Sequence, residues 1–516
     1  MTVHPGVPGA WPSVVHLLAD AARRSPAAPA LICGEDTLDY AAYVACVAGL
    51  ALELQSLGIG AGDRVALLMG NGADIAIATF GVQASGAQLV PLNPAYTASE
   101  LGPIFGDADC KALLFDESAE ASVASLLPRF APGLAWRVGP GARRLTEWRD
   151  QTALADRLPL PQPEALSTLQ YTGGTTGRSK GVNLTHRAVA INIAQREALL
   201  PTQRGRDRVL AITPLFHVYA VAMGLYLAAN CGGTLVIAER YRPEWVLEAI
   251  ARHRITLLAA SPTIFIGLMA SEAFARSDLS SLRLCYSGSS ALAAETLRRW
   301  QDATGCAICE GYGQSEAGPV LSYNPAQGMR KVGSVGLAVP GTTIEIVDVE
   351  TGTRTLGVGE VGEIRARGPQ IMSGYRNLPQ ETALALRDGW LHTGDLGELD
   401  ADGYLTIRDR KKEMAIVGGY NVYPREVEEA LFTHPAVQEA GVVGVPDAYR
   451  GEVLVGWVVV SDPQVAADDL LAHLAQRLVR YKIPKTLLVV PALPKTAVGK
   501  LDKNRLRQMA DGAPVP

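Results

Sequence analysis

The sequence is organised around one glycine- and threonine-rich stretch, Leu169-Gln170-Tyr171-Thr172-Gly173-Gly174-Thr175-Thr176-Gly177-Arg178-Ser179-Lys180-Gly181. Its glycines let the backbone turn tightly and bring N–H groups close to an anion, its hydroxyls add donors, and Lys180 adds one mobile positive charge. The spacing matches neither the Walker A loop nor the G-x-G-x-x-G pattern of dinucleotide-binding folds. The stretch therefore predicts a loop that binds a polyphosphate, with a flexible surface loop as the alternative.

The composition is that of a globular chain with more than one domain. Its 516 residues exceed the length of one ordinary domain, and 48% hydrophobic with 19% charged residues supply ample apolar surface for large cores. The formal net charge of −5 leaves no basic excess for nucleic acid. We therefore expect at least two domains and no nucleic-acid partner.

The cysteines and the N-terminus bear on the compartment. Seven scattered cysteines suit a reduced compartment, and the close pair Cys306 and Cys309 predicts buried strand cysteines more than a metal site. The N-terminus has no basic region followed by an apolar run, so no signal peptide is expected. Residues 209–237 contain no Asp, Glu, Lys or Arg, and the stretch is long enough to cross a bilayer. Pro214 and His217 interrupt its apolar run, so we expect a strand, a loop and a core helix there instead of a transmembrane segment. The expected location is cytoplasmic.

Helical and strand patterns alternate through the first part of the chain, which favours the α/β class. This alternation predicts mostly parallel sheets with helices on both faces. From residue 342 onward, short alternating strands separated by turns predict a small antiparallel barrel or sheet instead. The predicted helices are residues 13–24, 38–57 and 73–85, and the predicted strands are residues 30–33, 64–69, 87–91, 343–348 and 361–366.

A charged run, Arg408-Asp409-Arg410-Lys411-Lys412-Glu413, marks the expected domain boundary. Beyond it a fresh pattern of helices at residues 424–432 and 468–479 and strands at residues 440–445 and 453–460 predicts a compact α+β domain. We therefore expect an N-terminal domain over residues 1–409, a C-terminal domain over residues 410–516, and a hinge at about residues 409–412.

Further motifs follow in order: Glu310-Gly311-Tyr312-Gly313-Gln314-Ser315-Glu316, Trp390-Leu391-His392-Thr393-Gly394-Asp395, the charged run, and Pro494-Lys495-Thr496-Ala497-Val498-Gly499-Lys500. Together with the glycine-rich stretch, they resemble the adenylate-forming superfamily of acyl-CoA synthetases, peptide-synthetase adenylation domains and luciferases. Within it, residues 169–177, 408–413 and 418–424 are most similar to bacterial fatty-acyl-CoA ligases. The resemblance covers residues 17–506. It implies a large N-terminal domain of several subdomains, including a small β-barrel, and a small mobile α+β C-terminal domain.

The resemblance also implies an activity. It is the ATP-dependent ligation of a carboxylic acid to coenzyme A through an acyl-adenylate, with release of AMP and pyrophosphate. ATP, Mg²⁺ and coenzyme A are the implied cofactors and co-substrates, and a medium- or long-chain fatty acid is the expected acid. A monomer or a homodimer is expected, and peripheral membrane contact stays open for a lipid substrate.

The same resemblance assigns candidate residues for the nucleotide. Glu316 is the expected Mg²⁺ carboxylate, Asp395 and Arg410 are expected on the ribose side, and Lys500 is the lysine expected to bridge carboxylate and α-phosphate. Thr172 and Lys180 flank the loop that is expected to wrap the β- and γ-phosphates. The full nucleotide-binding set is Thr172, Gly173, Gly174, Thr175, Thr176, Gly177, Lys180, Gly288, Ser289, Ser290, Glu310, Gly311, Tyr312, Gly313, Gln314, Ser315, Asp395, Ile407, Arg410 and Lys500.

The remaining candidates concern the acyl group, coenzyme A and the hinge. His217 matches a family position beside the acyl pocket, with a core histidine as the alternative, and Lys412 matches the family's hinge position. Asp395 follows Thr393-Gly394, a turn expected to present its carboxylate at a strand end. The residues expected at coenzyme A are Gly418, Gly419, Tyr420 and Arg450, with Lys482 and Lys485 as further cationic candidates for its phosphates.

Several alternatives stay open at this point. An aryl or cinnamate-type acid is the alternative to an alkyl acid, and residues 218–224 and 262–268 are apolar enough to line a channel for either. A ligase that loads an acyl-carrier protein would use the same phosphopantetheine arm on a protein. An oxidative, luciferase-like enzyme and a nucleotide sensor without chemistry are more distant alternatives, and the presence of both Glu316 and Lys500 argues against the sensor.

Overall fold

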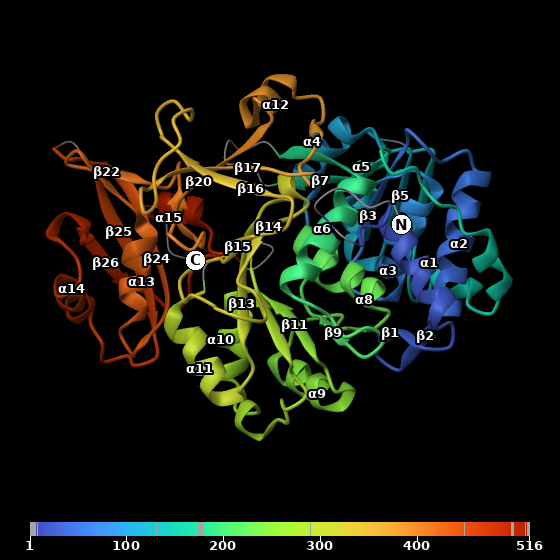
Figure 1. Ribbon diagram of the computed structural model, residues 1–516, viewed down its shortest axis with the longest axis horizontal. Helices are drawn as coiled ribbons and strands as arrows, with labels where there is room; N and C mark the ends of the chain where they lie inside the picture. Colours follow the sequence, from blue (N-terminus) through green and yellow to red (C-terminus); the bar gives the residue numbers. More distant parts are fainter. Residues whose placement is uncertain are drawn as a thin grey trace.

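A computed structural model of the chain describes residues 7, 9–130, 132–172, 179–288, 290, 292–447, 449–496, 500–510 and 512. Within them, four sheets and their covering helices form the molecule. In Figure 1 a seven-stranded and a nine-stranded sheet occupy the right and the centre. A small sheet lies above the nine-stranded one, and the last part of the chain forms a separate body on the left.

The first large sheet has seven strands and is parallel in its central part. Strands β4, β3, β5 and β6 run parallel to one another, β7 joins β4 in parallel, and β8 pairs antiparallel with β7. Its members, in spatial order, are β18 (Gly374–Tyr375), β8 (Lys180–Thr185), β7 (Leu166–Thr172), β4 (Gln88–Leu92), β3 (Arg64–Leu68), β5 (Ala112–Phe115) and β6 (Leu134–Arg137).

The second large sheet has nine strands and is also mostly parallel. Only its outer strands, β2 at one edge and β14 and β15 at the other, pair antiparallel with their neighbours. Its members, in spatial order, are β15 (Leu337–Ala338), β14 (Val320–Tyr323), β13 (Ile308–Gly313), β12 (Leu284–Ser287), β11 (Leu257–Ala260), β9 (Arg208–Ala211), β10 (Thr234–Ile237), β1 (Pro29–Cys33) and β2 (Asp36–Asp39). These two sheets confirm the predicted α/β class.

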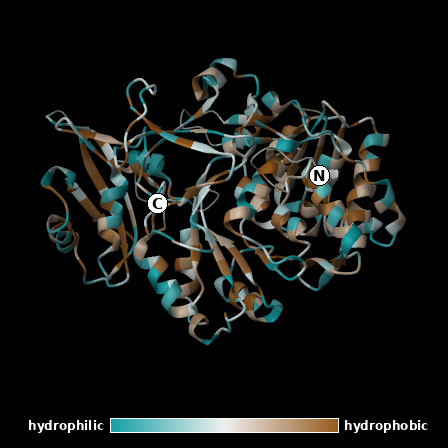
Figure 2. Cartoon of the chain, viewed as in Figure 1, coloured by the Kyte–Doolittle hydropathy of each residue, from teal (hydrophilic) through white to brown (hydrophobic). Residues whose placement is uncertain are grey.

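Helices cover both faces of the two sheets. Alternate residues of each strand point to opposite faces, so each sheet contributes to a core on either side. The largest core lies between the sheets and contains α1 (Val14–Arg24), α2 (Tyr40–Ser56), α3 (Ala73–Ser85), α6 (His186–Leu199) and α8 (Tyr226–Cys231). A second core packs α9 (Pro243–His253), α10 (Pro262–Ala270) and α11 (Ala294–Thr304) on the outer face of the nine-stranded sheet. A third packs α4 (Ala98–Ala108) and α5 (Glu120–Leu126) on the outer face of the seven-stranded sheet. Figure 2 shows the apolar strands enclosed by helices with polar outer faces.

The ends of the predicted helices follow local capping chemistry. The Ser13 side chain accepts the His16 N–H and begins α1, as the sequence predicted. Helix α3 has the predicted bounds, and Gly86, with φ of 91°, caps its C-terminal end. The predicted helix over residues 38–57 begins later, at Tyr40, because residues 36–39 form β2, and Asp39 caps the helix.

The uncharged stretch 209–237 contains the expected strand, loop and helix. Strand β9 is followed by α7 (Val218–Ala220), a π-helical turn (Val221–Leu225), α8 and β10. Among the described residues, none of the helices combines the length and apolarity needed to cross a lipid bilayer. Cys309 is buried on β13 and Cys306 is buried just before it. No group of three potential metal ligands of the His, Cys, Asp or Glu type gathers in the described chain.

The small unit after residue 342 is an antiparallel sheet, one of the two forms that the strand pattern predicted, and its described strands do not close into a barrel. Strands β16 and β19 are its two ends and do not pair with each other in the described chain. The ten-residue β20 pairs with β19 along its first part and with β21 along its second part, so the sheet extends along one edge instead of closing. Its members are β16 (Thr343–Val347), β17 (Gly362–Arg367), β20 (Trp390–Leu399), β19 (Leu386–Arg387) and β21 (Leu405–Arg410), and α12 (Pro379–Ala385) precedes β19.

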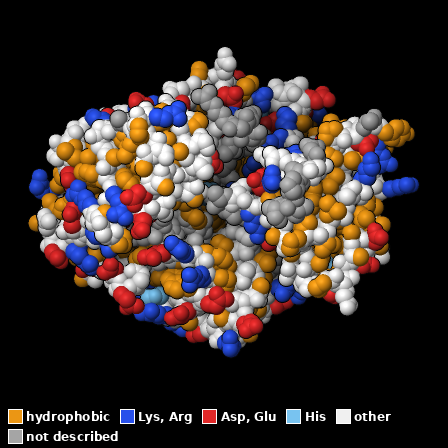
Figure 3. All heavy atoms as spheres, turned by 180° about the vertical axis from the view of Figure 1, so that it is seen from behind, with side chains coloured by type: hydrophobic (Ala, Val, Ile, Leu, Met, Phe, Trp, Pro, Cys, Tyr) orange, Lys and Arg blue, Asp and Glu red, His pale blue; other side chains and the backbone are white. Residues whose placement is uncertain are grey.

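The last part of the chain has its own sheet and cores. It has the α+β texture that the sequence predicted. Its elements are β22 (Ala415–Val417), β23 (Tyr420–Val422), α13 (Pro424–Phe432), β24 (Val437–Asp447), β25 (Gly451–Val460), α14 (Ala467–Ala475), β26 (Thr486–Val489) and α15 (Lys503–Ala510). Figure 3 shows the molecule from behind, where acidic and basic side chains are interspersed on the visible face instead of forming one basic surface.

Candidate active site

The glycine-rich stretch connects β7 to β8 as a hairpin. Thr172 ends β7 and pairs across the ladder with Lys180, the first residue of β8. The hairpin therefore holds Thr172 and Lys180 side by side at the two ends of the connecting segment. The predicted phosphate ligands Gly173, Gly174, Thr175, Thr176 and Gly177 lie outside the described residues, as does Ser289.

Glu316 and Lys180 lie in one polar group. The Tyr375 hydroxyl donates to Glu316 Oε1 at 2.9 Å, and the Lys180 ammonium lies 5.2 Å from the centroid of the same tyrosine ring. Lys180 is also ion-paired with Glu381 of α12. Burial raises the pKa of Glu316, while hydrogen bonds, including that from Tyr375, and the nearby Lys180 charge oppose the rise.

This donor set fits a hydrated Mg²⁺. Among the described residues, no lysine or arginine forms an ion pair with Glu316, and Lys180, the cation that lowers its pKa, is itself paired with Glu381. Mg²⁺ is commonly held by one or two carboxylates together with waters and substrate phosphates, not by a cage of protein ligands. Glu316 would hold such an ion beside the β7–β8 hairpin, where it would neutralise phosphate charge.

Tyr375 is a site residue that the sequence analysis missed. It belongs to the two-residue strand β18, which pairs with β8 opposite Val182. Its partners Lys180 and Glu316 are far from it in sequence. A strand of two residues is also too short to show the alternating pattern by which strands are predicted. Only the strand pairing brings the Tyr375 hydroxyl to Glu316.

Asp395 and Arg410 face each other across β20 and β21. They are register partners, and Arg410 Nε lies 3.6 Å from Asp395 Oδ1. The Tyr312 hydroxyl donates to Asp395 Oδ2 at 2.6 Å. One carboxylate thus joins an aromatic ring from β13 with a cation from β21, which suits recognition of a nucleoside whose ribose offers two hydroxyls.

The prediction that Asp395 lies at a strand end is wrong. Asp395 lies inside β20, because Gly394, with φ of 71°, distorts the strand without ending it. The Gly394 carbonyl accepts the Lys411 N–H at 2.9 Å, and the ladder shifts register between Leu396 and Gly397. This irregularity turns the Asp395 carboxylate toward Tyr312, as a strand end would have done.

Lys500 reaches this same place from the end of the chain. Burial lowers the pKa of its ammonium to about 8; the Arg410 charge adds to the fall and the Asp395 charge opposes it. His217 is also close, since burial and then the Lys500 charge lower the pKa of its imidazole to about 3. The Lys500 side chain therefore lies near the Asp395–Arg410 pair and near His217, although these residues come from separate parts of the fold.

The loop that carries Lys500 is closed at its base. The Thr496 N–H donates to the Lys500 carbonyl at 2.7 Å, and the Lys500 N–H donates to the Thr496 hydroxyl at 3.2 Å. Immediately after the loop, Lys503 begins α15. The position of the Lys500 ammonium is therefore tied to that helix.

His217 begins the helical segment beside the site. Its Nδ1 accepts the Tyr219 N–H at 3.3 Å, which caps α7. This contact orients the imidazole, and its pKa of about 3 makes the ring a weak base. Tyr219, the next aromatic residue, packs its ring over Gly288.

Close packing explains three of the predicted nucleotide-binding glycines. A Cβ on Gly288 would lie 2.8 Å from the Tyr219 ring, and one on Gly311 would lie 2.4 Å from the Tyr323 ring. A Cβ on Gly313 would lie 1.8 Å from the Pro319 carbonyl oxygen. Larger residues would therefore displace either the aromatic rings or the backbone on which Tyr312 is held.

The other predicted nucleotide residues surround Tyr312. Glu310 precedes it on β13 and is buried, and burial raises the pKa of the Glu310 carboxyl to about 7 despite the nearby Arg425 charge. Gln314 and Ser315 lead directly into the turn that carries Glu316. Ser290 is exposed beyond β12, and Ile407 is partly buried on β21 opposite Gly397.

The predicted coenzyme A residues gather elsewhere, in the C-terminal body. Gly418 and Gly419, with φ of 59° and 85°, form the tight turn between β22 and β23. Tyr420 follows them, is 58% exposed, and stacks on Tyr481 with ring centroids 4.5 Å apart. The Gly418 N–H donates to the Arg450 carbonyl at 2.8 Å, which joins this turn to the β24–β25 connection.

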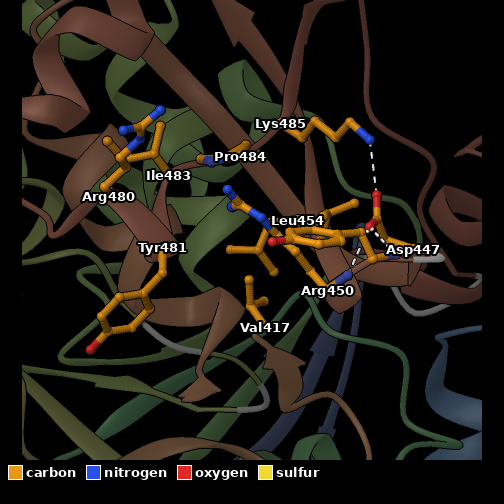
Figure 4. Close-up of a pocket in the computed structure, with 11 residues that line it drawn as sticks. Val417, Asp447, Arg450, Leu454, Arg480, Tyr481, Ile483, Pro484 and Lys485 are labelled. Atoms are coloured by element: carbon orange, nitrogen blue, oxygen red, sulfur yellow. Dashed lines mark hydrogen bonds and ion pairs between the residues drawn. The ribbon is translucent and has the colours of Figure 1, made fainter. Parts of the chain in front are cut away.

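Arg450 and Lys485 line a cavity of about 480 Å³ next to that turn (Figure 4). Asp447 anchors both: its carboxylate accepts the Arg450 N–H at 3.0 Å and lies 2.9 Å from Lys485 Nζ. Lys482 is not part of the lining, because its ammonium is bound by both carboxylate oxygens of Glu426 on α13. The cavity is lined by Val417, Asp447, Tyr449, Arg450, Val453, Leu454, Arg480, Tyr481, Ile483, Pro484 and Lys485.

Comparisons with known proteins agree with this geometry. Residues 18–376 match the family model described as "AMP-binding enzyme", and residues 426–500 match that described as "AMP-binding enzyme C-terminal domain". A long-chain-fatty-acid–CoA ligase of Bacillus subtilis (strain 168) is 38% identical, covering 95% of this chain and 93% of the relative. A feruloyl-CoA synthase of an Amycolatopsis species is 36% identical, covering 97% and 98%.

A solved structure is similar over nearly its whole length. ATP-bound MatB from Rhodopseudomonas palustris is 30% identical, with a TM-score of 0.87, and the similarity covers 96% of this chain and 99% of that one. The family models span the glycine-rich hairpin, Tyr312 and Glu316 in the first match and Lys500 at the end of the second, whereas Asp395 and Arg410 lie between the two matches. The chain therefore belongs to the AMP-binding enzyme family and is an adenylate-forming enzyme.

Proposed function

We propose that this protein is an AMP-forming carboxylate–CoA ligase. The observation that carries the proposal is the surroundings of Lys500: the charges of Arg410 and Asp395, which lie 3.6 Å apart, act on its pKa, and its own charge acts on the pKa of His217. A mobile cation at the junction of a nucleoside-binding carboxylate and an acyl-side histidine is suited to joining a carboxylate to an α-phosphate.

The chemistry explains why these groups are needed. A carboxylate is a poor acylating agent because its leaving group would be oxide. Attack of a carboxylate oxygen on the α-phosphorus of ATP forms a new P–O bond, breaks the bond to the β-phosphate oxygen and releases pyrophosphate. The acyl carbon then has AMP as its leaving group, and the coenzyme A thiolate replaces it to form the thioester. Lys500 would hold the two anionic reactants together, and the Thr172–Lys180 hairpin would receive the charge of the departing pyrophosphate.

A medium- or long-chain fatty acid is the acid we propose first. It rests on the residues that resemble fatty-acyl-CoA ligases and on the 38% identical relative named for long-chain fatty acids. An aryl acid is the second candidate. It rests on the 36% identical relative named as a feruloyl-CoA synthase.

We further propose that coenzyme A binds at the C-terminal body. Arg450 and Lys485 would face its phosphates, and the Gly418–Gly419 turn would border the pantetheine arm. In Figure 1, β22, the strand that leads into this turn, lies toward the outer side of that body. Lys500, in contrast, lies near Asp395 and Arg410. Both sets of residues cannot serve one acyl group in the same arrangement, so the domain over residues 410–516 would rotate about Lys412 between the two steps.

A panel of carboxylic acids tests the proposal. Purified protein, ATP and Mg²⁺ are incubated with acetate, octanoate, palmitate, ferulate and benzoate, and pyrophosphate, AMP and thioester are measured with and without coenzyme A. The expected result is AMP plus pyrophosphate, thioester only with coenzyme A, and the highest kcat/KM on octanoate or palmitate. Formation of ADP and phosphate would refute the adenylation chemistry, and a preference for acetate would refute the substrate class.

The same assay separates the remaining alternatives. If a phosphopantetheinylated acyl-carrier protein were acylated faster than coenzyme A, the acceptor would be the carrier protein. We propose a cytoplasmic location and a monomer or homodimer, which fractionation of cells and sedimentation of the purified protein would test.

A further inference from the structure

A single carboxylate, that of Asp409, connects the N-terminal sheet to the helix that begins the C-terminal domain. Asp409 lies on β21, where it pairs with Leu396 of β20, and is 6% exposed. Its Oδ1 accepts the Arg410 N–H at 2.8 Å, and its Oδ2 accepts the Arg425 N–H at 3.1 Å. Arg425 lies beyond Lys412, so the second hydrogen bond crosses the hinge.

Helix α13 needs this carboxylate because it has no cap of its own. Tyr423 occupies the N-cap position without a side-chain hydrogen bond, and Pro424 at the first helical position has no N–H to offer. The Arg425 N–H is the next donor that the helix leaves unpaired, and Asp409 accepts it. A negative charge at a helix N-terminus also interacts favourably with the helix dipole.

A buried lysine extends the contact to the Lys500 loop. Lys503, the first residue of α15, has its Nζ 2.9 Å from Glu428 Oε1 on α13, and that oxygen also accepts the Val442 N–H at 2.9 Å. The Lys503 charge also acts on Asp409, where it opposes the increase that burial causes in the pKa of that carboxyl. Lys503 is three residues from Lys500, so α13, α15 and the catalytic lysine move together.

We propose that Asp409 is a positioning residue that holds the C-terminal domain in the arrangement with Lys500 inside the nucleotide pocket. The inference rests on the proposed function, because it assigns the contact to the adenylation step. Rotation about Lys412 carries the Arg425 N–H and Lys503 away from Asp409, which stays on β21. Asp409 therefore favours adenylation and has no partner across the hinge in the second step.

The substitution Asp409→Asn isolates the contact. Asparagine keeps the size of the side chain but has one acceptor atom, whereas Asp409 accepts two backbone N–H groups. Loss of a helix cap typically changes an equilibrium about fivefold. Adenylation, measured as pyrophosphate release without coenzyme A, should slow about fivefold. Conversion of supplied acyl-AMP and coenzyme A to thioester should be unchanged or faster, and Asp409→Glu should restore much of the adenylation rate.

Two further variants keep the test decisive. Lys503→Met removes the cation from α15 without touching Arg410, and it should slow the same step while sparing thioester formation. Asp388→Asn makes the same chemical change in an exposed turn, at a residue with φ of 52°, and should alter neither half-reaction. If Asp409→Asn fails to fold, Lys503→Met alone decides the question.

The outcomes separate this inference from the function on which it rests. Equal loss of both half-reactions in Asp409→Asn and Lys503→Met, with thermal midpoints near that of the unmodified protein, would overturn the positioning role. So would full adenylation activity in both variants. If the unmodified protein forms no acyl-adenylate from any acid, the proposed function itself is refuted.

Discussion

Acyl-adenylate formation should decline at alkaline pH because Lys500 loses its proton. Burial, reinforced by Arg410 and opposed by Asp395, lowers the pKa of the Lys500 ammonium to about 8. Only the charged form stabilises the negative charge shared by the carboxylate and the α-phosphate. Since the pKa is lowered, the active protonation state is complete below pH 7 and is lost as the pH rises through 8.

The size of the effect follows from the pKa. With a pKa of about 8, charged Lys500 outnumbers the neutral form about 10 to 1 at pH 7, and the ratio is reversed at pH 9. We therefore expect kcat/KM for adenylation to fall about tenfold between these two pH values. A lysine with the ordinary pKa of about 10.4 would remain about 95% charged at pH 9. His217 adds no titration in this range, because burial and the Lys500 charge lower its pKa to about 3.

The assay measures pyrophosphate release without coenzyme A, at substrate concentrations below KM, from pH 7 to pH 10. Under these conditions kcat/KM reports ionisations of the free enzyme, and the thiol of coenzyme A cannot contribute. Lys500→Arg is the control, since a guanidinium stays charged throughout. Its adenylation rate should be lower than that of the unmodified protein but independent of pH over this range.

Two results would refute this reasoning. A flat profile up to pH 9.5 in the unmodified protein would show that Lys500 keeps its proton or does not act through its charge. An alkaline decline of the same midpoint in Lys500→Arg would assign the titration to another group.

Four further predictions concern single positions. Lys500→Ala should block adenylation yet still convert supplied acyl-AMP and coenzyme A to thioester. Equal loss of both half-reactions in a folded variant would refute the idea that the C-terminal domain adopts a different arrangement for each step. Glu316→Gln should slow adenylation about 10²–10³-fold, as expected for one electrostatic group, and near-normal activity would place the metal elsewhere. Lys412→Pro should spare adenylation and block thioester formation, because proline fixes φ near −65° at the hinge. Lys412→Ala should change both rates little, and separate assays of the two half-reactions show whether the hinge depends on backbone rotation or on the lysine charge. Burial raises the pKa of Glu310 to about 7, so its ionisation destabilises the fold as pH rises from about 4.5 to 7; Glu310→Gln should raise the thermal midpoint by roughly 1–3 °C at pH 8 but not at pH 5.

Helix-capping residues allowed the sequence to predict where two helices begin and end. Ser13 and Gly86 act within one or two turns of the helices they begin or end, so residues 13–24 and 73–85 could be read from the sequence with small errors. The antiparallel unit was less predictable. Its openness depends on how β20 divides its two halves between β19 and β21, and no local pattern records that division.

The candidate site residues also divide into those that a local motif identifies and those that only a tertiary contact identifies. Asp395 and Glu316 lie in motifs, and the sequence was sufficient to name them. Tyr375 and Asp409 act through partners that only the tertiary fold brings near, namely Glu316 and the Arg425 N–H. Asp409 lies within the charged run that the sequence analysis singled out, but its partner 16 residues later could not be known without the packing of α13 against β21.

The lowered pKa of Lys500 has a consequence for the order of events. In any arrangement that exposes Lys500 to solvent, its pKa would return toward about 10.4, and the ammonium would be fully hydrated. Moving it into the pocket therefore opposes domain closure until a negatively charged ligand compensates for the lost hydration. ATP supplies that charge. By linkage, a ligand that favours the closed arrangement is itself bound more tightly by it, so ATP binding and closure should reinforce each other. Asp409 acts on the same equilibrium from the other side of the hinge, because its contact with α13 stabilises closure whether or not ATP is bound. The depressed pKa of Lys500 opposes closure and the Asp409 cap favours it. A balance of two opposed terms is what allows a domain to close for one step and leave for the next.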